Sequence, residues 1–231
     1  MMWQHLLVAL GVNLVLSFLA WKIGGVRGSG VWGGLLVGVP IYYCLGLSGF
    51  LVLVGMFVIG TVLTKFGYGK KAAMGAAEDR KGARGASHAL ANVGVATLAA
   101  ILALITNNPV FPLAYVAALA TSAMDTAGSE LGPLYGKKTI SLKNLRPVPP
   151  GTEGAVSLEG TLGGLLVAAL LGLLGAGLGV ISWPGVLFVV LGAFIGNLYE
   201  GILGSRKLLP HSWLNATNTL VGALAASLFL L

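Results

Sequence analysis

The chain has 231 residues, of which 56% are hydrophobic and only 9% are charged, and its formal net charge is +7. Soluble domains carry far more charge, so the composition excludes an ordinary soluble globular protein and favours an integral membrane protein. The single cysteine, Cys44, excludes an intramolecular disulfide and a cysteine-based metal site. The sequence therefore predicts an all-α, polytopic membrane protein without a separate soluble domain.

The charged side chains fall into four short windows: Lys22 to Arg27, Lys65 to Arg84, Asp125 to Glu159 and Glu200 to Lys207. A hydrocarbon core ~30 Å thick takes roughly 20 helical residues to cross, and a charge at its centre costs a few kcal/mol. The uncharged tracts at the two termini, 1–21 and 208–231, are each about long enough for one membrane crossing. The three uncharged tracts between the windows, 28–64, 85–124 and 160–199, are each about long enough for two crossings. One transmembrane domain, residues 1–231, with about eight (seven or eight) helices is predicted.

Each long tract is expected to reverse at its middle, where turn-forming residues stand: Gly46 to Gly49, Asn107 to Pro109 and Ser182 to Gly185. All four windows then emerge on one side, which holds every Lys and Arg. That side is predicted to be cytoplasmic, or stromal in a plastid. Loops are expected there at about 65–84, 125–159 and 200–207. A signal peptide is the alternative for residues 1–21, but no basic segment precedes its apolar run.

The acidic residues share these windows with the basic ones, although acids contribute little to membrane orientation. Mixed acids and bases at a membrane face suit a phosphorylated ligand, because carboxylates hold Mg²⁺ and basic groups neutralise phosphate. The competing explanation is solvated loop charge. We therefore expect the charged face to be the working surface of the protein.

Two acidic residues end apolar segments. Asp125 follows the segment 110–124, and if the helix continues, Ser129 shares its face at i+4 and Glu130 comes next. Glu200, preceded by Asn197, ends the seventh segment in the same way. A carboxylate at the hydrocarbon boundary is a functional candidate, and simple interfacial solvation is the alternative.

Phosphate-binding candidates lie between these acids and beyond them. The stretch from Pro147 to Gly154 is a rigid proline segment that opens into glycine. Its glycines let backbone N–H groups approach phosphate, and Ser157 or Thr161 could add hydroxyl groups at a helix start. Asn215 and Asn218 are polar residues at the start of the last helix. The three histidines are far apart, so a zinc site is not expected and they are interpreted as interfacial.

Six motifs, in order, resemble those of one known family. They are Lys65-Phe66-Gly67-Tyr68; Ala77-Glu78-Asp79 with Lys81 to Gly85; Leu90-Ala91-Asn92; Asp125-Thr126 with Ser129 to Gly132; Pro149 to Thr152 with Gly154, Val156 and Ser157; and Asn215 with Asn218-Thr219. Together they resemble the phytyl-phosphate kinase family, polytopic membrane proteins that include transmembrane protein 19. The resemblance covers nearly the whole chain. It departs at Glu200-Gly201, where the family is expected to have Asp-Ser.

The resemblance implies transfer of a phosphoryl group from a nucleoside triphosphate, typically CTP, to a prenyl monophosphate. Residue chemistry and resemblance together assign three sets of residues. The expected catalytic residues are Asp125, Glu130, Lys65, Lys81 and Arg84. The expected substrate-binding and nucleotide-binding residues are Glu78, Asn92, Ser129, Gly151, Thr152, Ser157, Asn197, Asn215 and Asn218. The expected Mg²⁺ ligands are Asp125, Glu130, Glu78 and Glu200.

The expected partners are a prenyl-phosphate lipid, a nucleoside triphosphate and membrane lipid, with no nucleic acid and with a homodimer left open. A cytidylyltransferase of the CDP-diacylglycerol type would use the same metal and CTP but release pyrophosphate. A transporter is the nonenzymatic alternative. Against it, no acid or base lies inside an apolar tract, where coupled transporters tend to keep them.

Overall fold

The computed structural model describes residues 2–77, 82–152 and 154–230. Helices make up most of this described part, and its one sheet has two short antiparallel strands. The elements are α1 Met2–Lys22, α2 Gly28–Lys65, α3 Tyr68–Ala73, α4 Ala86–Thr106, α5 Val110–Tyr135, β1 Thr139–Ser141, β2 Ala155–Ser157, α6 Leu158–Gly177, α7 Gly185–Gly204 and α8 His211–Leu228.

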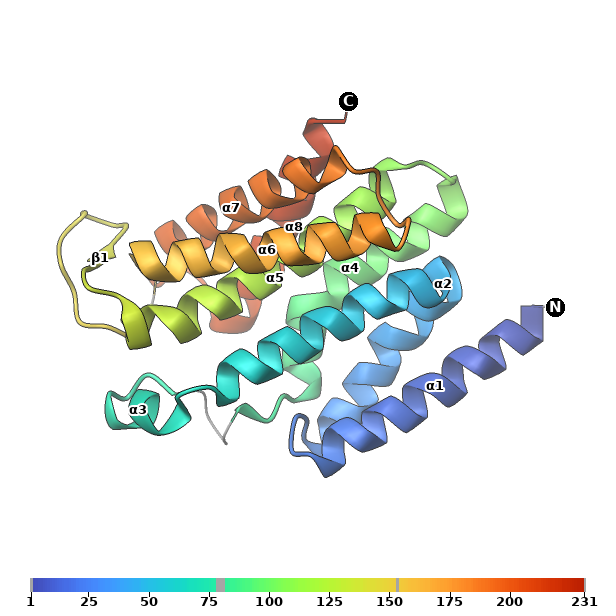
Figure 1. Cartoon of the computed structure of the whole chain (residues 1–231), viewed down its shortest axis with the longest axis horizontal. Coiled ribbons are helices and arrows are strands. Elements are labelled where there is room, and N and C mark those ends of the chain that lie inside the picture. Colours follow the sequence, from blue (N-terminus) through green and yellow to red (C-terminus); the bar gives the residue numbers. More distant parts are fainter. Residues whose placement is uncertain (1, 78–81, 153, 231) are drawn as a thin grey trace.

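Helix α2 folds back on itself at Gly46. This residue has φ of 63° and ψ of −163°, a conformation that essentially only glycine adopts without strain. Figure 1 shows the two halves of α2 running in opposite directions from this point. Each half is about 27 Å long, close to the thickness of a hydrocarbon core. The predicted reversal is confirmed, and the buried Tyr115 hydroxyl donates a 2.7 Å hydrogen bond to the Gly49 carbonyl oxygen beside it.

Six helices of the described part are long and apolar enough to cross a membrane, namely α1, α2, α4, α5, α6 and α7. Helix α8 is not among them, and its first half carries Asn215, Thr217, Asn218 and Thr219. The multi-pass helical architecture is confirmed. The count of seven or eight crossings stays a prediction.

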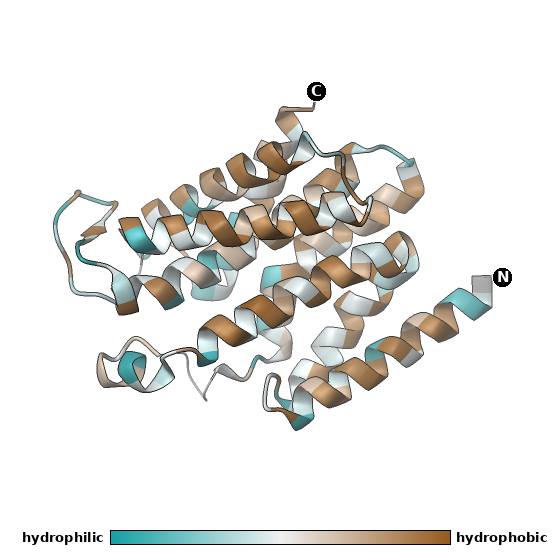
Figure 2. Cartoon of the chain, viewed as in Figure 1, coloured by the Kyte–Doolittle hydropathy of each residue, from teal (hydrophilic) through white to brown (hydrophobic). Residues whose placement is uncertain are grey.

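The two ends of the bundle differ in chemistry. The segments that link α1 to α2, α2 to α4, α5 to α6 and α7 to α8 lie at one end, and both termini and the turn at Gly46 lie at the other (Figure 1). Hydrophilic residues gather in the loop that carries β1 and in α3, whereas the long helices are mostly hydrophobic (Figure 2). The charged windows thus share one end, as expected, and the side of the membrane that this end faces stays a prediction.

Helices continue into the predicted charged loops. Helix α5 runs beyond Asp125 to Tyr135, and α7 runs beyond Glu200 to Gly204. The segments predicted to be loops from 125 and from 200 thus begin with helical turns, and the points where they leave the membrane stay a prediction. Charge marks where a chain meets water, but a helix can project past the hydrocarbon because its backbone hydrogen bonds do not depend on the solvent around it.

Helix α5 is the centre of the bundle. It packs against α2, α4, α6, α7 and α8, and 72% of its most apolar window is buried, against 11% for the peripheral α1. Its buried face is rich in alanine, from Ala114 to Ala127. Small side chains let neighbouring helices approach closely, which is how helices associate in membranes without a hydrophobic driving force between them. The polar residues of α5 beyond Met124 are consequently surrounded by several helix ends.

Sidedness can be tested with single cysteines in a Cys44→Ser background. The positions Asn108, Ser182 and Ala73 are all exposed, the first two at one end of the bundle and the third at the other. Asn108→Cys and Ser182→Cys should react with a membrane-impermeant maleimide in intact cells, and Ala73→Cys should react only after the membrane is opened. Labelling of Ala73→Cys in intact cells would contradict the predicted orientation.

Candidate functional site

A cavity of about 270 Å³ lies at the charged end of the bundle. Its wall is formed by the beginning of α4, the second half of α5, the segment 150–157, the first turn of α6, the end of α7 and the beginning of α8. The predicted site residues that line it are Asn92, Asp125, Ser129, Gly151, Thr152, Ser157, Asn197, Glu200 and Asn215. Residues as far apart in sequence as Asn92 and Asn215 thus border one space.

Helix α5 contributes Asp125 and Ser129 to the cavity, one turn apart. The predicted i, i+4 relation between them is therefore present in the structure. Glu130 follows Ser129, but at about 100° of rotation per residue it lies roughly 140° around the helix from Asp125. The structure accordingly does not place Glu130 in the cavity wall.

Glu130 instead forms a buried ion pair with Lys71 of α3. The Lys71 ammonium group is fully buried and also donates hydrogen bonds to the carbonyl oxygens of Leu63, at 3.1 Å, and Thr64, at 2.9 Å. These carbonyl groups belong to the last turn of α2, where a cation is favoured by the helix dipole. Lys71 therefore ties the end of α2 to α5, and the sequence had offered no reason to single it out.

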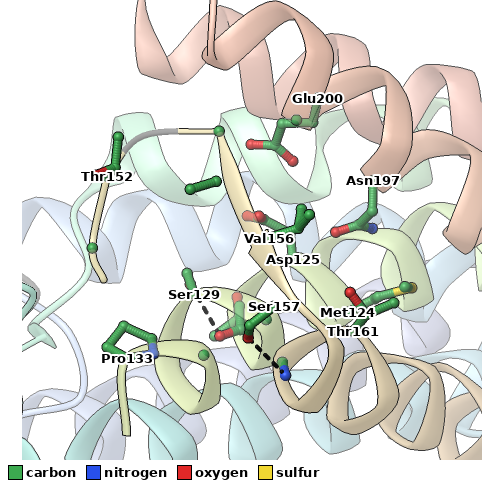
Figure 3. Close-up of a pocket in the computed structure, with 18 of the residues that line it drawn as sticks. Met124, Asp125, Ser129, Pro133, Thr152, Val156, Ser157, Thr161, Asn197 and Glu200 are labelled. Carbon is green, nitrogen blue, oxygen red and sulfur yellow. Dashed lines mark hydrogen bonds between the residues drawn. The ribbon is translucent and has the colours of Figure 1, made fainter. Parts of the chain in front are cut away.

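Glu200 reaches the cavity from α7, across from Asp125 (Figure 3). Its side chain is buried, and the amide of Asn218 on α8 donates a hydrogen bond to its Oε2. With its amide turned to suit its neighbours, Asn215 donates to Glu200 Oε1 at 3.3 Å and to the His211 carbonyl oxygen at 3.1 Å. Asn218 does not line the cavity, so it orients Glu200 from behind.

Asn197 faces the same space as the two carboxylates (Figure 3). Its Nδ2 atom donates to the carbonyl oxygens of Thr121, at 3.1 Å, and Ala193, at 2.9 Å. Because both amide protons are used on backbone groups, the side-chain oxygen is the group that Asn197 can offer to a ligand. Three oxygen-bearing side chains on two helices therefore meet in the cavity.

Three helices begin at the cavity wall: α4 with His88, α6 with Gly160 and Thr161, and α8 with His211. Helix N-termini carry partial positive charge and attract anions. At α6, Ser157 acts as the N-cap, its Oγ accepting a 3.2 Å hydrogen bond from the Gly160 N–H. These helix starts favour an anion at the cavity, whereas the carboxylates of Asp125 and Glu200 in the same wall favour a cation.

His88 and His211, interpreted from the sequence as interfacial, both border the cavity. Each stands four residues before a predicted asparagine, in His88-x-x-x-Asn92 and His211-x-x-x-Asn215. Residues at i and i+4 share a helix face. This repeated spacing is the signal that could have placed the histidines beside the asparagines.

The segment between β1 and α6 covers the cavity. Gly151 and Gly154 have φ of 82° and 69°, in the left-handed region that favours glycine. A Cβ atom at position 151 would lie 2.8 Å from that of Ala76, and one at 154 would lie 2.2 Å from the Ser205 nitrogen. Gly151 therefore packs closely against Ala76 after α3, and Gly154 packs closely against Ser205 at the end of α7.

The predicted basic clamp is not found at the cavity within the described residues, because no Lys or Arg lines it. Lys65 is exposed and donates to the Ile23 carbonyl oxygen at 3.0 Å, and the Arg84 guanidinium lies 5.9 Å from the centre of the Phe57 ring. Both stand on the side of the bundle formed by α1 and α2. Glu78 and Lys81 lie outside the described residues.

A magnesium site of three or more acids is likewise not assembled by the residues that the structure describes. Asp125 and Glu200 are the two carboxylates of the cavity wall. Mg²⁺ is commonly held by one or two carboxylates and completes its coordination with water and substrate phosphates. The oxygen donors present, including Asn197, therefore fit a magnesium ion that arrives with a phosphorylated substrate.

Comparison with known proteins adds the family. Residues 11–209 match the family model described as Integral membrane protein DUF92. The chain belongs to this family. The membership confirms the polytopic membrane family that the sequence motifs indicate. No solved structure matches the chain.

Three relatives illustrate the spread of the family. Uncharacterized membrane protein sll0875 of Synechocystis is 39% identical over 83% of this chain and 77% of its own length. Protein VTE6, chloroplastic, of Arabidopsis thaliana is 36% identical over 89% of this chain, which spans 66% of that protein. Uncharacterized membrane protein MJ0933 of Methanocaldococcus jannaschii is 31% identical over 95% of this chain and 92% of its own length.

Proposed function

We propose that this DUF92 protein is a membrane-embedded kinase that transfers the γ-phosphoryl group of CTP, or of another nucleoside triphosphate, to an isoprenoid monophosphate. One observation carries the proposal: a single cavity joins two carboxylates, Asp125 and Glu200, to the first turns of three helices. The motif resemblance to phytyl-phosphate kinases and the similarity to Arabidopsis protein VTE6 support the same reaction. The end of the bundle that holds the cavity would face the cytoplasm or stroma.

The chemistry needs positioning and charge neutralisation more than it needs a base. The second pKa of a phosphate monoester is about 6, so the acceptor oxygen is already largely ionised near neutral pH. That oxygen forms a bond to the γ-phosphorus, the bond from the γ-phosphorus to the bridging oxygen breaks, and a nucleoside diphosphate leaves. The starts of α4, α6 and α8 would hold the phosphate groups in line for this step.

Asp125 and Glu200 are the residues that would hold Mg²⁺, which supplies neutralisation of the developing phosphate charge when it is bound. Asn215 and Asn218 would keep the Glu200 carboxylate turned toward the cavity. Asn197, Ser129 and Thr161 offer an amide oxygen and hydroxyl groups that can orient the substrates.

Labelled nucleotides test the reaction directly. Purified protein given γ-³²P-labelled CTP and a prenyl phosphate should place the label in a lipid-soluble product, because the terminal phosphoryl group is transferred. With α-labelled CTP, the label should stay in the water-soluble nucleoside diphosphate. Thin-layer chromatography of the extracted lipid provides the measurement.

The same experiment separates the other candidates. A cytidylyltransferase would move α label into lipid and release the γ label as pyrophosphate, which would overturn the kinase proposal. If neither the α label nor the γ label enters the lipid, with several prenyl phosphates and with both ATP and CTP, the kinase proposal is overturned in favour of a transporter.

A further inference from the structure

The cavity wall holds two carboxylates, but within the described residues no lysine or arginine lines it. The side chains of the wall that can carry a positive charge are those of His88 and His211. His88 is half-buried and His211 is exposed, and in the described part of the chain their ring nitrogens make no hydrogen bond to the protein. Each imidazole therefore has an N–H group to offer to a ligand.

The two histidines are neighbours on parallel helices. Helices α4 and α8 both begin at the charged end of the bundle and pack against each other. A terminal atom of the Asn215 amide lies 3.4 Å from Asn92 Oδ1. His88 and His211 stand one turn nearer the two helix starts on the same faces. His211 is near enough to act electrostatically on His88, so the two rings border one part of the cavity.

The asparagines behind the histidines are already engaged. Asn92 is 3% exposed; its Nδ2 atom donates to the His88 carbonyl oxygen at 2.9 Å, and its Oδ1 atom accepts a 2.8 Å hydrogen bond from Ser122 Oγ. Asn215 is 4% exposed and donates to Glu200 and to a backbone carbonyl oxygen. The histidine rings are thus side-chain groups that a ligand can use without displacing a hydrogen bond between described residues.

We propose that His88 and His211 bind the phosphate group of the acceptor lipid through their imidazole N–H groups, an inference that rests on the proposed function. In phosphoryl transfer the metal bridges the β- and γ-oxygens of the nucleotide, so Asp125 and Glu200 would take the nucleotide on their side of the cavity. The acceptor phosphate has no such metal and needs other donors. Two imidazoles can hold two of its oxygens and leave the third free to attack the γ-phosphorus.

The surroundings of the pair also favour an anion. Among the described residues, no side chain caps the first turn of α4 or of α8, where Gly85 and Pro210 are the N-caps, so these turns retain N–H groups for an anion. Arg27 and Arg84 are near enough to His88 to act on it electrostatically, and their positive charge adds to the attraction. An acceptor phosphate at the histidines is therefore stabilised by nearby charge as well as by hydrogen bonds.

Nuclear magnetic resonance of the imidazoles tests this binding without turnover. The chain has three histidines, and His5 lies near the start of α1, at the end of the bundle that holds both termini, so its signal is an internal control. With protein labelled at histidine Cε1 in phosphatidylcholine nanodiscs, dimethylallyl phosphate should shift the His88 and His211 signals and leave the His5 signal in place. Dimethylallyl alcohol, which lacks the phosphate, should shift none of them.

The inference is overturned if dimethylallyl phosphate leaves the His88 and His211 signals unmoved. It is also overturned if Mg²⁺ and CTP alone shift them equally, since the pair then binds the nucleotide. Equal shifts from phosphatidylglycerol in the nanodisc, without added ligand, would overturn it as well, because the pair then binds membrane lipid.

Phenylalanine variants give the kinetic counterpart. His88→Phe and His211→Phe keep a ring but lose the N–H donors, so each should raise the KM for dimethylallyl phosphate about tenfold, the equivalent of about 1.4 kcal/mol, at an unchanged KM for CTP. His88→Gln keeps an N–H donor and should recover part of the loss. The matched control, His5→Phe, should behave as the unmodified protein.

Equal rises in the KM values for dimethylallyl phosphate and CTP would contradict the assignment of the histidines to the acceptor. The proposed function can fail separately. If the unmodified protein transfers no phosphoryl group but dimethylallyl phosphate still shifts the His88 and His211 signals, the phosphate site stands and the proposed kinase function fails.

Discussion

Replacement of Asp125 by asparagine should lower turnover by at least ~100-fold, the effect typical of losing one electrostatic contribution to a transition state. Asp125→Asn keeps the size and polarity of the side chain but removes the charge that would hold Mg²⁺ beside the phosphates. Asp125 lines the cavity at the point where α5 emerges from its most buried stretch. The initial rate of phosphoryl transfer to a prenyl phosphate measures the effect.

The matched control is Glu159→Gln. Glu159 lies on the first turn of α6, does not line the cavity, and accepts a 3.3 Å hydrogen bond from the Lys137 N–H. This variant should retain the rate of the unmodified protein. A well-expressed, correctly folded Asp125→Asn protein with near-normal turnover would remove Asp125 from the site.

Loss of the Lys71–Glu130 ion pair should have the largest effect on stability. Glu130→Ala leaves the Lys71 ammonium group fully buried without its counter-charge, and breaking a buried pair in this way costs about 3–5 kcal/mol. The free energy of unfolding in detergent micelles, from denaturant titration followed by circular dichroism, is the measurement. Lys71→Met should be similarly destabilising, because it leaves the Glu130 carboxylate buried.

The double variant Lys71→Met/Glu130→Met separates the charge effect from packing. It removes both charges together, so its loss of unfolding free energy should be well below the sum of the losses in the two single variants. Additive costs would show that the two residues do not act as a pair. If Glu130→Gln reduced turnover ~100-fold at unchanged stability, Glu130 would take part in the reaction, as its sequence motif predicts.

The turns between helices were the part of the fold most open to prediction. Gly46, Asn107 and Ser182 lie where the structure reverses or leaves a helix, because an uncharged tract of twice the bilayer thickness must turn at its middle. Helix ends at the charged face were harder to predict. Helix α5 continues from Asp125 to Tyr135, because the charges that mark its exit from lipid do not tell a projecting helix from a loop.

The candidate site was predictable where residues are neighbours along one helix. The i, i+4 spacing of Asp125 and Ser129 correctly placed both on the cavity side of α5. The same periodicity rotates Glu130 away from the cavity. Which face of α5 points toward the cavity, however, is set by how α5 packs against the surrounding helices. The basic residues illustrate the same limit, because Arg84 is close to the motif residue Asn92 in sequence but packs against Phe57 of α2.

The sequence by itself determined that this is a multi-pass helical membrane protein of the DUF92 family with its charges at one end, because a hydrocarbon core admits few charges and only self-satisfied backbones. Tertiary structure alone decided that Glu200 faces Asp125 and that Glu130 pairs with Lys71, a residue 59 positions away. It also decided that His88 and His211 border one cavity. Contacts of this kind depend on how helices cross, and a pattern of hydrophobic and charged residues does not specify the crossing.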